Sequence, residues 1–167
     1  MENTNEYKGL NVGDITVMKN ITYTDVDAIR QIANFHTEML QDDPMAQKGK
    51  TAMMCALYEE MIQRRLKYEQ EYICVVSEQT QIHAYIWGHF DAPSKTVTIE
   101  SLYVSEEYRH KGIATKLKRN VERWAKSLRA QQVIGTVLAS NTAMLTLNEK
   151  LGYRVQKVIM QKELNSD

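Results

Sequence analysis

The chain has 167 residues, of which 43% are hydrophobic and 25% are charged, and its 21 basic residues balance 21 acidic ones. This length and composition are typical of one globular domain with a core of its own, which we expect to span residues 1–167. A protein that binds long nucleic acids usually carries a basic excess, so the balanced charge argues against a nucleic-acid module.

Neither a targeting segment nor a membrane span is expected from the sequence. Residues 1–14 are polar and lack the apolar stretch of a signal peptide, and no apolar run approaches the ~20 residues of a transmembrane helix. Cys55 and Cys74 lack metal-ligand spacing and make no disulfide framework. We therefore expect a cytoplasmic protein with reduced thiols and no metal site.

The first part of the chain predicts one strand and two helices. Residues 15–22 favour a strand, and a helix follows from Thr24. A second helix is expected at about 51–68, where apolar residues recur at helical spacing. Leu57 and Met61 should lie on its inward face.

The rest of the chain alternates between strands and helices. Three strands with short links should form an antiparallel meander, at 72–77, 82–91 and 96–104. A helix then begins near Gly112, and a strand, a helix and a last strand are expected at 131–140, 141–151 and 153–164. The order βααβββαβαβ predicts an α/β fold, with a mixed, mostly antiparallel sheet flanked by helices on both faces.

The loop before the helix at Gly112 has the features of an anion site. The helix carries an apolar stripe, so it should pack on the sheet with its N-terminus near the end of the preceding strand. Free N–H groups and the helix dipole attract an anion there, Gly112 allows close approach to the backbone, and Arg109 and Lys111 add charge. This pattern predicts a phosphate or pyrophosphate site. The alternative is a packing glycine in a solvated basic face, to which Lys118 would belong.

Two sequence motifs resemble those of one enzyme family. The segment Arg109-His110-Lys111-Gly112-Ile113-Ala114 matches the acyl-CoA loop, Q/R-x-x-G-x-G/A, of the GNAT superfamily of N-acetyltransferases. Downstream, Asn141 opens a segment that ends in Leu-Gly-Tyr153 and is similar to the second signature of that family. Two motifs in the right order around a βαβ unit are a specific signal, and they cover about residues 97–153.

The resemblance implies acetyl-CoA as the co-substrate. In this family the fourth and fifth strands separate, and the pantetheine arm lies along the fourth, which here would use backbone groups of Leu102, Tyr103 and Val104. The pyrophosphate would lie beside Arg109, on the amides of His110, Lys111, Gly112, Ile113 and Ala114. Asn141 would hydrogen-bond near the cofactor arm, and its alternative role is to cap the helix that follows.

Acetyl transfer needs a group that accepts a proton from the amine. Glu100 is the best candidate base, because alternation in its strand places it on the same face as Leu102 and Val104. A carboxylate among apolar neighbours is suited to accepting a proton, directly or through a water, and members of the resembled family often carry a glutamate here. The alternative is that Glu100 binds a cationic substrate or pairs with a lysine.

The group that protonates the departing thiolate differs from the family pattern. Many relatives have a tyrosine seven residues after the motif asparagine, where this chain has Asn148, and an amide has no proton to give at neutral pH. Tyr153 is our candidate, with Tyr103 or a water as alternatives. A thiol with a pKa of about 8.5 is also a tolerable leaving group without an acid.

The expected substrate is the primary amine of a small cationic molecule, which attacks the thioester in a ternary complex. The first two helices and the turn at 88–95 offer residues that suit a cation: Asp42, Asp43, Glu59, Glu60, His89 and Asp91, with Tyr58, Trp87 and Phe90 nearby. The alternatives are a lysine or N-terminal amine of a protein as the substrate, and a non-catalytic acyl-CoA sensor. A homodimer is compatible with all of these.

Overall fold

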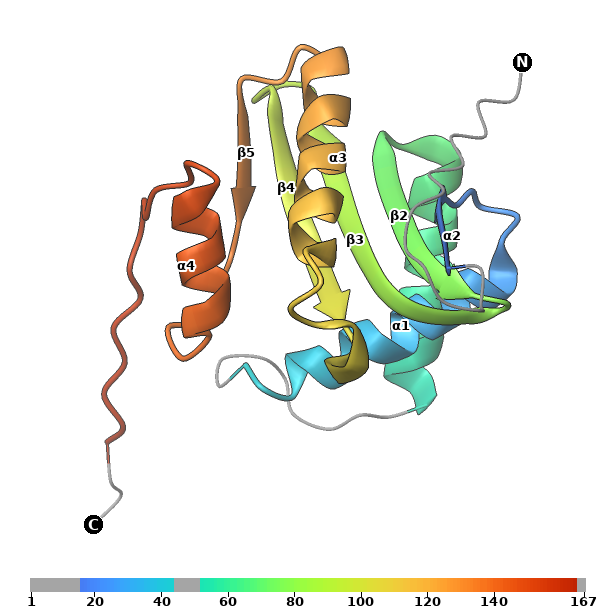
Figure 1. Ribbon diagram of the computed structural model, residues 1–167, viewed down its shortest axis with the longest axis horizontal. Coiled ribbons are helices and arrows are strands. Elements are labelled where there is room, and N and C mark those ends of the chain that lie inside the picture. Colours follow the sequence, from blue (N-terminus) through green and yellow to red (C-terminus); the bar gives the residue numbers. More distant parts are fainter. Residues whose placement is uncertain (1–15, 44–51, 165–167) are drawn as a thin grey trace. The chain divides into compact units, whose positions relative to one another are not determined.

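The computed structural model describes residues 16–43 and 52–164 (Figure 1). The chain divides into two compact units, one that ends at Thr136 and one that begins at Val137. The single domain expected over residues 1–167 stays a prediction. No helix among the described residues is long and apolar enough to cross a membrane.

The first unit is built on a five-stranded sheet in the order β1-β2-β3-β4-β5. Its strands are β1 (Thr16–Asn20), β2 (Glu71–Glu78), β3 (Gln81–Asp91), β4 (Thr96–Val104) and β5 (Gln132–Gly135). The first four pair antiparallel with their neighbours, whereas β5 runs parallel to β4. The predicted meander and the mixed, mostly antiparallel sheet are therefore confirmed.

Helices cover both faces of this sheet (Figure 1). On one face, α1 (Val26–Leu40) and α2 (Ala52–Tyr68) enclose a core that includes Ile73 and Val75 of β2. On the other face, α3 (Ile113–Ser127) packs over Cys74 and Val76 of the same strand. Since neighbouring residues of a strand point to opposite faces, these two cores lie on opposite sides of the sheet.

The inward face of α2 differs by one residue from the prediction. Leu57 is 59% exposed, whereas Ile62 is fully buried and Met61 and Leu66 pack against the core. One residue along a helix corresponds to a rotation of about 100°, so a small error in the direction of the apolar stripe moves Leu57 to the solvent. The prediction for Leu57 is wrong, and that for Met61 is confirmed.

A β-bulge interrupts β4 at Glu100. Trp87 pairs with Ser101 and Gly88 pairs with Ile99, which leaves Glu100 as the extra residue. The bulge shifts the alternation by one position, so Leu102 and Val104 pack with α3, whereas Tyr103 packs with α1 and α2. Arg65 of α2 contacts Glu100, which places Glu100 on the Tyr103 side. The expectation that Glu100 shares a face with Leu102 and Val104 is therefore wrong.

The C-terminal part of the chain contains fewer strands than predicted. The strand expected at 131–140 is limited to β5, and the predicted helix is α4 (Thr142–Lys150). Residues 153–164 form no strand, and those from 154 to 164 are exposed. Their sequence alternates as a strand does, but a strand also needs a hydrogen-bonding partner, and no described strand pairs with them.

Candidate functional site

The pairing of β4 with β5 stops halfway along β4. The last paired residues are Ile99 and Gly135, and β4 continues to Val104 with β3 as its partner. The Ser105 N–H donates to the carbonyl of His83 in β3 (2.8 Å). Because the direction of backbone groups alternates along a strand, the N–H and C=O of Tyr103 also point toward β3, and those of Leu102 and Val104 point away from it. An extended ligand can pair with that open edge.

The loop after β4 ends in a glycine that starts α3. Gly112 has a left-handed backbone (φ 74°) and occupies the N-cap, where it offers no side chain to the first turn. The first bond of the helix runs from the Lys116 N–H to the Gly112 carbonyl (3.1 Å). The N–H groups of Ile113, Ala114 and Thr115 therefore precede the helical ladder, and they can bind an anion at the positive end of the helix.

Side chains hold this loop against the ends of the neighbouring strands. The Tyr108 hydroxyl donates to Glu78 (2.8 Å), and the ring of His83 stacks on that of Tyr108 with centroids 4.2 Å apart. Arg109 Nε donates to the carbonyl of Val104 (3.1 Å), while Lys111 Nζ lies 4.9 Å from the centre of the Tyr108 ring. The positive charges are thus fixed near the start of α3.

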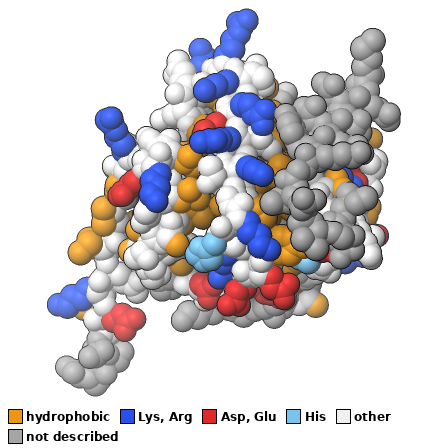
Figure 2. Space-filling model, in the orientation of Figure 1, with side chains coloured by type: hydrophobic (Ala, Val, Ile, Leu, Met, Phe, Trp, Pro, Cys, Tyr) orange, Lys and Arg blue, Asp and Glu red, His pale blue; other side chains and the backbone are white. Residues whose placement is uncertain are grey.

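The basic residues of α3 do not form one solvated face. Figure 2 looks onto α3 and shows Lys and Arg side chains along it, and Lys116, Arg119 and Arg123 are exposed. Lys118, however, is only 3% exposed. Burial lowers the pKa of the Lys118 ammonium to about 8, while the nearby Glu122 opposes this shift. The prediction that Lys118 belongs to a solvated face is wrong.

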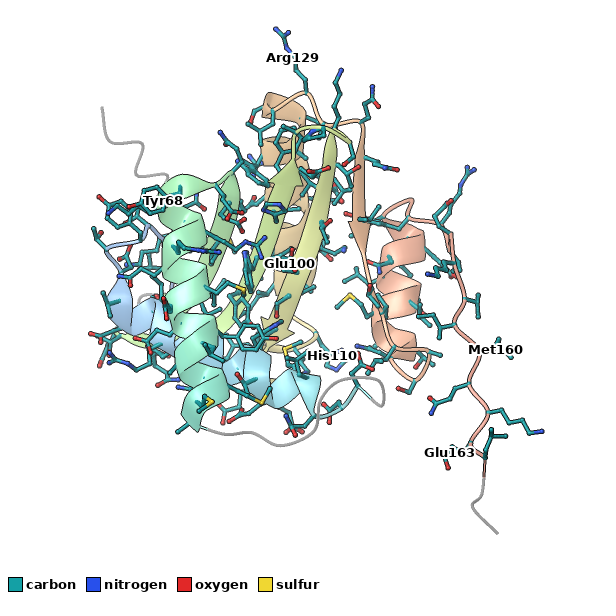
Figure 3. The ribbon with its side chains drawn as sticks, turned by 180° about the vertical axis from the view of Figure 1, so that it is seen from behind. Tyr68, Glu100, His110, Arg129, Met160 and Glu163 are labelled. Atoms are coloured by element: carbon teal, nitrogen blue, oxygen red, sulfur yellow. The ribbon has the colours of Figure 1, made fainter. Side chains whose placement is uncertain are left out.

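Glu100 lies beside α2 and pairs with a basic side chain of that helix (Figure 3). Its side chain is 30% exposed, and Oε1 lies 3.3 Å from Nη2 of Arg65. The same guanidinium lies 3.0 Å from Oε1 of Glu71. The apolar neighbours expected for Glu100, Leu102 and Val104, lie on the other face, and its basic partner is an arginine instead of a lysine.

A second titratable side chain, His36 of α1, faces the same region. Burial lowers the pKa of His36 below its usual value of 6.5, and the negative charge of Glu100 opposes this shift. The imidazole packs edge-on against the rings of Tyr58 (4.7 Å between centroids) and Trp87 (5.6 Å). His36 on α1 and Glu100 on β4 belong to distant elements, so the sequence does not show that they are neighbours, and the only signal is the position of His36 on the inward face of α1.

Aromatic side chains surround the bulged part of β4 on the side of α1. Phe35 stacks on Tyr103 with ring centroids 4.5 Å apart. The Tyr85 hydroxyl shares a hydrogen bond with Ser101 Oγ (2.8 Å), and the same Oγ lies 3.9 Å from the sulfur of Met39. Tyr103, one of the alternatives for the acid, thus has its side chain on the Glu100 side of the sheet.

Two of the acidic residues that the sequence suggested for a cationic substrate, Glu59 and Asp91, have partners within the protein. Glu59 pairs with Arg30 (3.4 Å), and Asp91 accepts from the backbone N–H of Ser94 (3.1 Å). His89 contacts Glu71, and Trp87 is buried and donates to Glu71. These contacts give Glu59, Asp91, His89 and Trp87 structural roles, whereas Asp42 and Glu60 are exposed.

Glu69, Glu71 and His89 bring possible metal-ligating atoms within 4.8 Å of one another. Arg65, however, lies 3.0 Å from Glu71 and 3.6 Å from Glu69, and Trp87 also donates to Glu71. A guanidinium at these carboxylates supplies the positive charge that a metal would bring. We interpret the cluster as an ion-pair network.

Asn141, Asn148 and Tyr153 belong to the second unit. The Asn141 side chain accepts from the Met144 N–H (3.1 Å) and caps α4, which is its alternative role. The side-chain oxygen of Asn148 is buried and has no hydrogen-bond partner among the described residues. The Tyr153 N–H donates to the backbone carbonyl of Asn148 (2.9 Å). Roles for Asn141 at the cofactor and for Tyr153 as an acid stay predictions.

Comparisons with known proteins agree on one family. The model of the acetyltransferase (GNAT) family matches residues 37–153. A crystal structure from Staphylococcus aureus, described as a GNAT family acetyltransferase, is 37% identical and has a TM-score of 0.66, with 71% of this chain and 98% of that chain covered. The uncharacterized N-acetyltransferase YdgE of Bacillus subtilis is 24% identical over 152 residues, with 88% of this chain and 97% of YdgE covered.

The fold is also shared with an enzyme of named substrate class. The aminoglycoside N-acetyltransferase AAC(6')-Iy, solved in complex with CoA, has a TM-score of 0.64 and is 16% identical. The similarity covers 92% of this chain and 98% of that chain. At this identity the likeness concerns the fold.

Proposed function

The chain belongs to the acetyltransferase (GNAT) family, and on that premise we propose that it transfers the acetyl group of acetyl-CoA to the primary amine of a small cationic molecule. One observation carries the proposal: β4 loses its partner β5 at Ile99, directly before Glu100. An open strand edge, a carboxylate and an anion-binding helix start then follow one another between residues 100 and 115.

The residues that would hold acetyl-CoA fit the two polar parts of that molecule. The backbone groups of Leu102 and the N–H of Val104 point to the open edge of β4 and would pair with the amides of the pantetheine arm, while the Val104 carbonyl already accepts from Arg109. The free N–H groups of Ile113 and Ala114 would hold the pyrophosphate, with positive charge from Lys111. When bound, acetyl-CoA supplies the activated thioester.

Glu100 would accept the proton that the amine must lose. One of its oxygens contacts Arg65, and no donor reaches the other oxygen within the described part of the chain. That second oxygen is available to an amine or to a bridging water. Because its pKa is lowered, His36 is mostly neutral at pH 7 and would not repel a cationic substrate.

The leaving thiolate does not require a dedicated acid. A thiol with a pKa of about 8.5 leaves readily at neutral pH, and Asn148 has no proton to supply. Tyr103, on the Glu100 side of the sheet, and Tyr153 are the side chains of this chain that would donate one. We infer direct attack in a ternary complex. The serine next to Glu100, Ser101, is buried and its Oγ shares a hydrogen bond with the Tyr85 hydroxyl, which argues against Ser101 as an acyl carrier.

The class of substrate is supported by the surroundings of Glu100. Aromatic rings of Phe35, Tyr58 and Tyr103 lie on the same side of the sheet, and aromatic faces attract ammonium groups. The shared fold with an aminoglycoside N-acetyltransferase agrees with an amine of this kind. Glu59 and Asp91 contribute less to this preference, because they are paired within the protein.

The test is thiol release from acetyl-CoA with a panel of amines: spermidine, kanamycin, glucosamine, and peptides with a free lysine or a free N-terminus. We expect release above the rate without amine for spermidine or for an amino sugar. Release with the peptides alone would transfer the function to proteins as substrates. CoA binding by calorimetry without release for any amine would contradict the proposal and favour a sensor.

A further inference from the structure

Arg65 connects the candidate base to a buried anchor. Its guanidinium contacts three carboxylates, at 3.0 Å for Glu71, 3.3 Å for Glu100 and 3.6 Å for Glu69. The centre of the guanidinium also lies 5.1 Å from the centre of the Trp87 ring, within cation–π distance. Arg65 itself is 14% exposed, so this side chain is held on several sides.

The anchor of this arrangement is Glu71. Its side chain is fully buried, and it accepts hydrogen bonds from Arg65 and from the indole N–H of Trp87 while it contacts the imidazole of His89. A buried carboxylate with this many partners has one orientation, because turning it would leave the buried donors around it without an acceptor. The position of the guanidinium is thus set by Glu71, on β2, and not by Glu100.

Glu100, by contrast, is the more exposed partner and sits on the bulge of β4. A bulged residue lacks a direct cross-strand neighbour, so its side chain receives little support from β3. The contact from Arg65 to Oε1 is the hydrogen bond that orients the carboxylate among the described residues. With Oε1 held by Arg65, Oε2 is the oxygen that no donor among the described residues reaches.

We propose that Arg65 is a positioning residue for acetyl transfer: anchored by Glu71, it fixes one oxygen of Glu100 so that the other meets the amine. The inference rests on the proposed function, because it assigns Arg65 a role only through Glu100. It extends the site from β4 to a residue of α2 that no sequence motif marks.

A double-mutant cycle tests the inference. Arg65→Lys keeps a positive charge next to Glu71 but replaces the two-pronged guanidinium by a single ammonium. With acetyl-CoA and the panel amine of highest kcat/KM, we expect kcat to fall about tenfold or more, since small displacements of a reacting group are costly. The amine KM and the CoA affinity should change by less than about twofold.

Comparing the effect of Arg65→Lys in wild-type protein and in Glu100→Gln protein separates a positioning role from a structural one. In Glu100→Gln protein, Arg65→Lys should not lower kcat further, because the group it positions is already lost. An equal loss in both backgrounds would overturn the inference. Glu71→Gln is a further variant that tests the anchor. It loosens the anchor without changing Glu100, so it should lower kcat in wild-type protein but not in Glu100→Gln protein.

A matched control comes from the ion pair between Arg30 and Glu59, which joins α1 to α2 at 3.4 Å. Arg30→Lys should leave kcat unchanged. If Glu100→Gln itself leaves kcat unchanged, the proposed base fails; if Glu100→Gln is slow but Arg65→Lys is not, only the present inference fails.

Crystal structures test whether Arg65 orients Glu100 even if no panel amine reacts. In Arg65→Lys protein the Glu100 carboxylate should leave its wild-type orientation. The same orientation in both structures would overturn the role of Arg65.

Discussion

Glu100 owes its direction to one extra residue in β4. The alternating pattern of 96–104 predicts the strand correctly but assigns Glu100 to the face of α3, because a bulge leaves no mark in the spacing of apolar residues. The contact with Arg65 joins residues 35 positions apart. Sequence reasoning could therefore identify Glu100 as a candidate base, but neither its face nor its partner.

The partly buried imidazole of His36 should make the stability of the protein depend on pH. Because burial lowers its pKa below 6.5 in the folded protein, the unfolded state binds more protons, and the stability that neutral His36 contributes is complete above pH 6.5 and is lost as the pH falls. The free energy of unfolding of wild type should therefore decrease more steeply between pH 7.5 and 5.5 than that of His36→Gln.

Urea denaturation of both proteins at the two pH values measures this difference. A gap between wild type and His36→Gln that does not change with pH would show that His36 is not buried in its neutral form.

At the scale of elements, the loop and the start of α3 were the most predictable part of the site. The motif between Arg109 and Ala114 is local, and the structure has the helix start that the sequence predicts there, with a left-handed Gly112 at the N-cap. β5 was less predictable: its residues suggested a strand of ten positions, but only Gln132–Gly135 pair with β4. Strand length depends on the partner as well as on the segment itself.

The left-handed backbone of Gly112 should be needed for CoA binding. Its φ of 74° is one that a β-branched residue adopts only at a cost of ~1–3 kcal/mol, although a Cβ would meet nothing within 4 Å. Gly112→Val should therefore weaken CoA binding about tenfold or more in calorimetry, and Gly112→Asn should weaken it less, since asparagine tolerates this conformation. CoA binding by Gly112→Val with wild-type affinity would refute the assignment of this loop.

The buried ammonium of Lys118 should destabilise the folded protein at neutral pH. Since burial lowers its pKa from 10.5 to about 8, the charged form is penalised in the folded state below pH 8, and this penalty is relieved as the pH rises from 8 toward 10.5. Lys118→Met should raise the melting temperature by a few degrees at pH 7, and the gain should shrink above pH 8.

The control for Lys118 is Lys116→Met, two residues away on an exposed position of α3. It should change the melting temperature little. If Lys118→Met lowers the melting temperature at pH 7, the ammonium is stabilised by its surroundings rather than penalised by them.

Nine of the ten elements expected from the sequence, β1 to α4, occur in the structure in the expected order, because each of them has a clear local pattern. Short links make the pairing of β2, β3 and β4 almost unavoidable. The tenth, at 153–164, was wrong as a strand, since alternation alone cannot supply a partner. The family, by contrast, could be recognised from two short motifs, and the match over residues 37–153 confirms it.

The central claim is that Glu100, at the point where β4 leaves β5, accepts the proton of the amine. Single-turnover thiol release, measured with acetyl-CoA and the best amine of the panel for wild type and Glu100→Gln, tests it most directly. We predict that Glu100→Gln slows release about a hundredfold or more while its CoA affinity, from calorimetry, stays within about twofold of wild type. Release at the wild-type rate, or a change confined to the KM of the amine, would contradict the claim and leave Glu100 as a binding group.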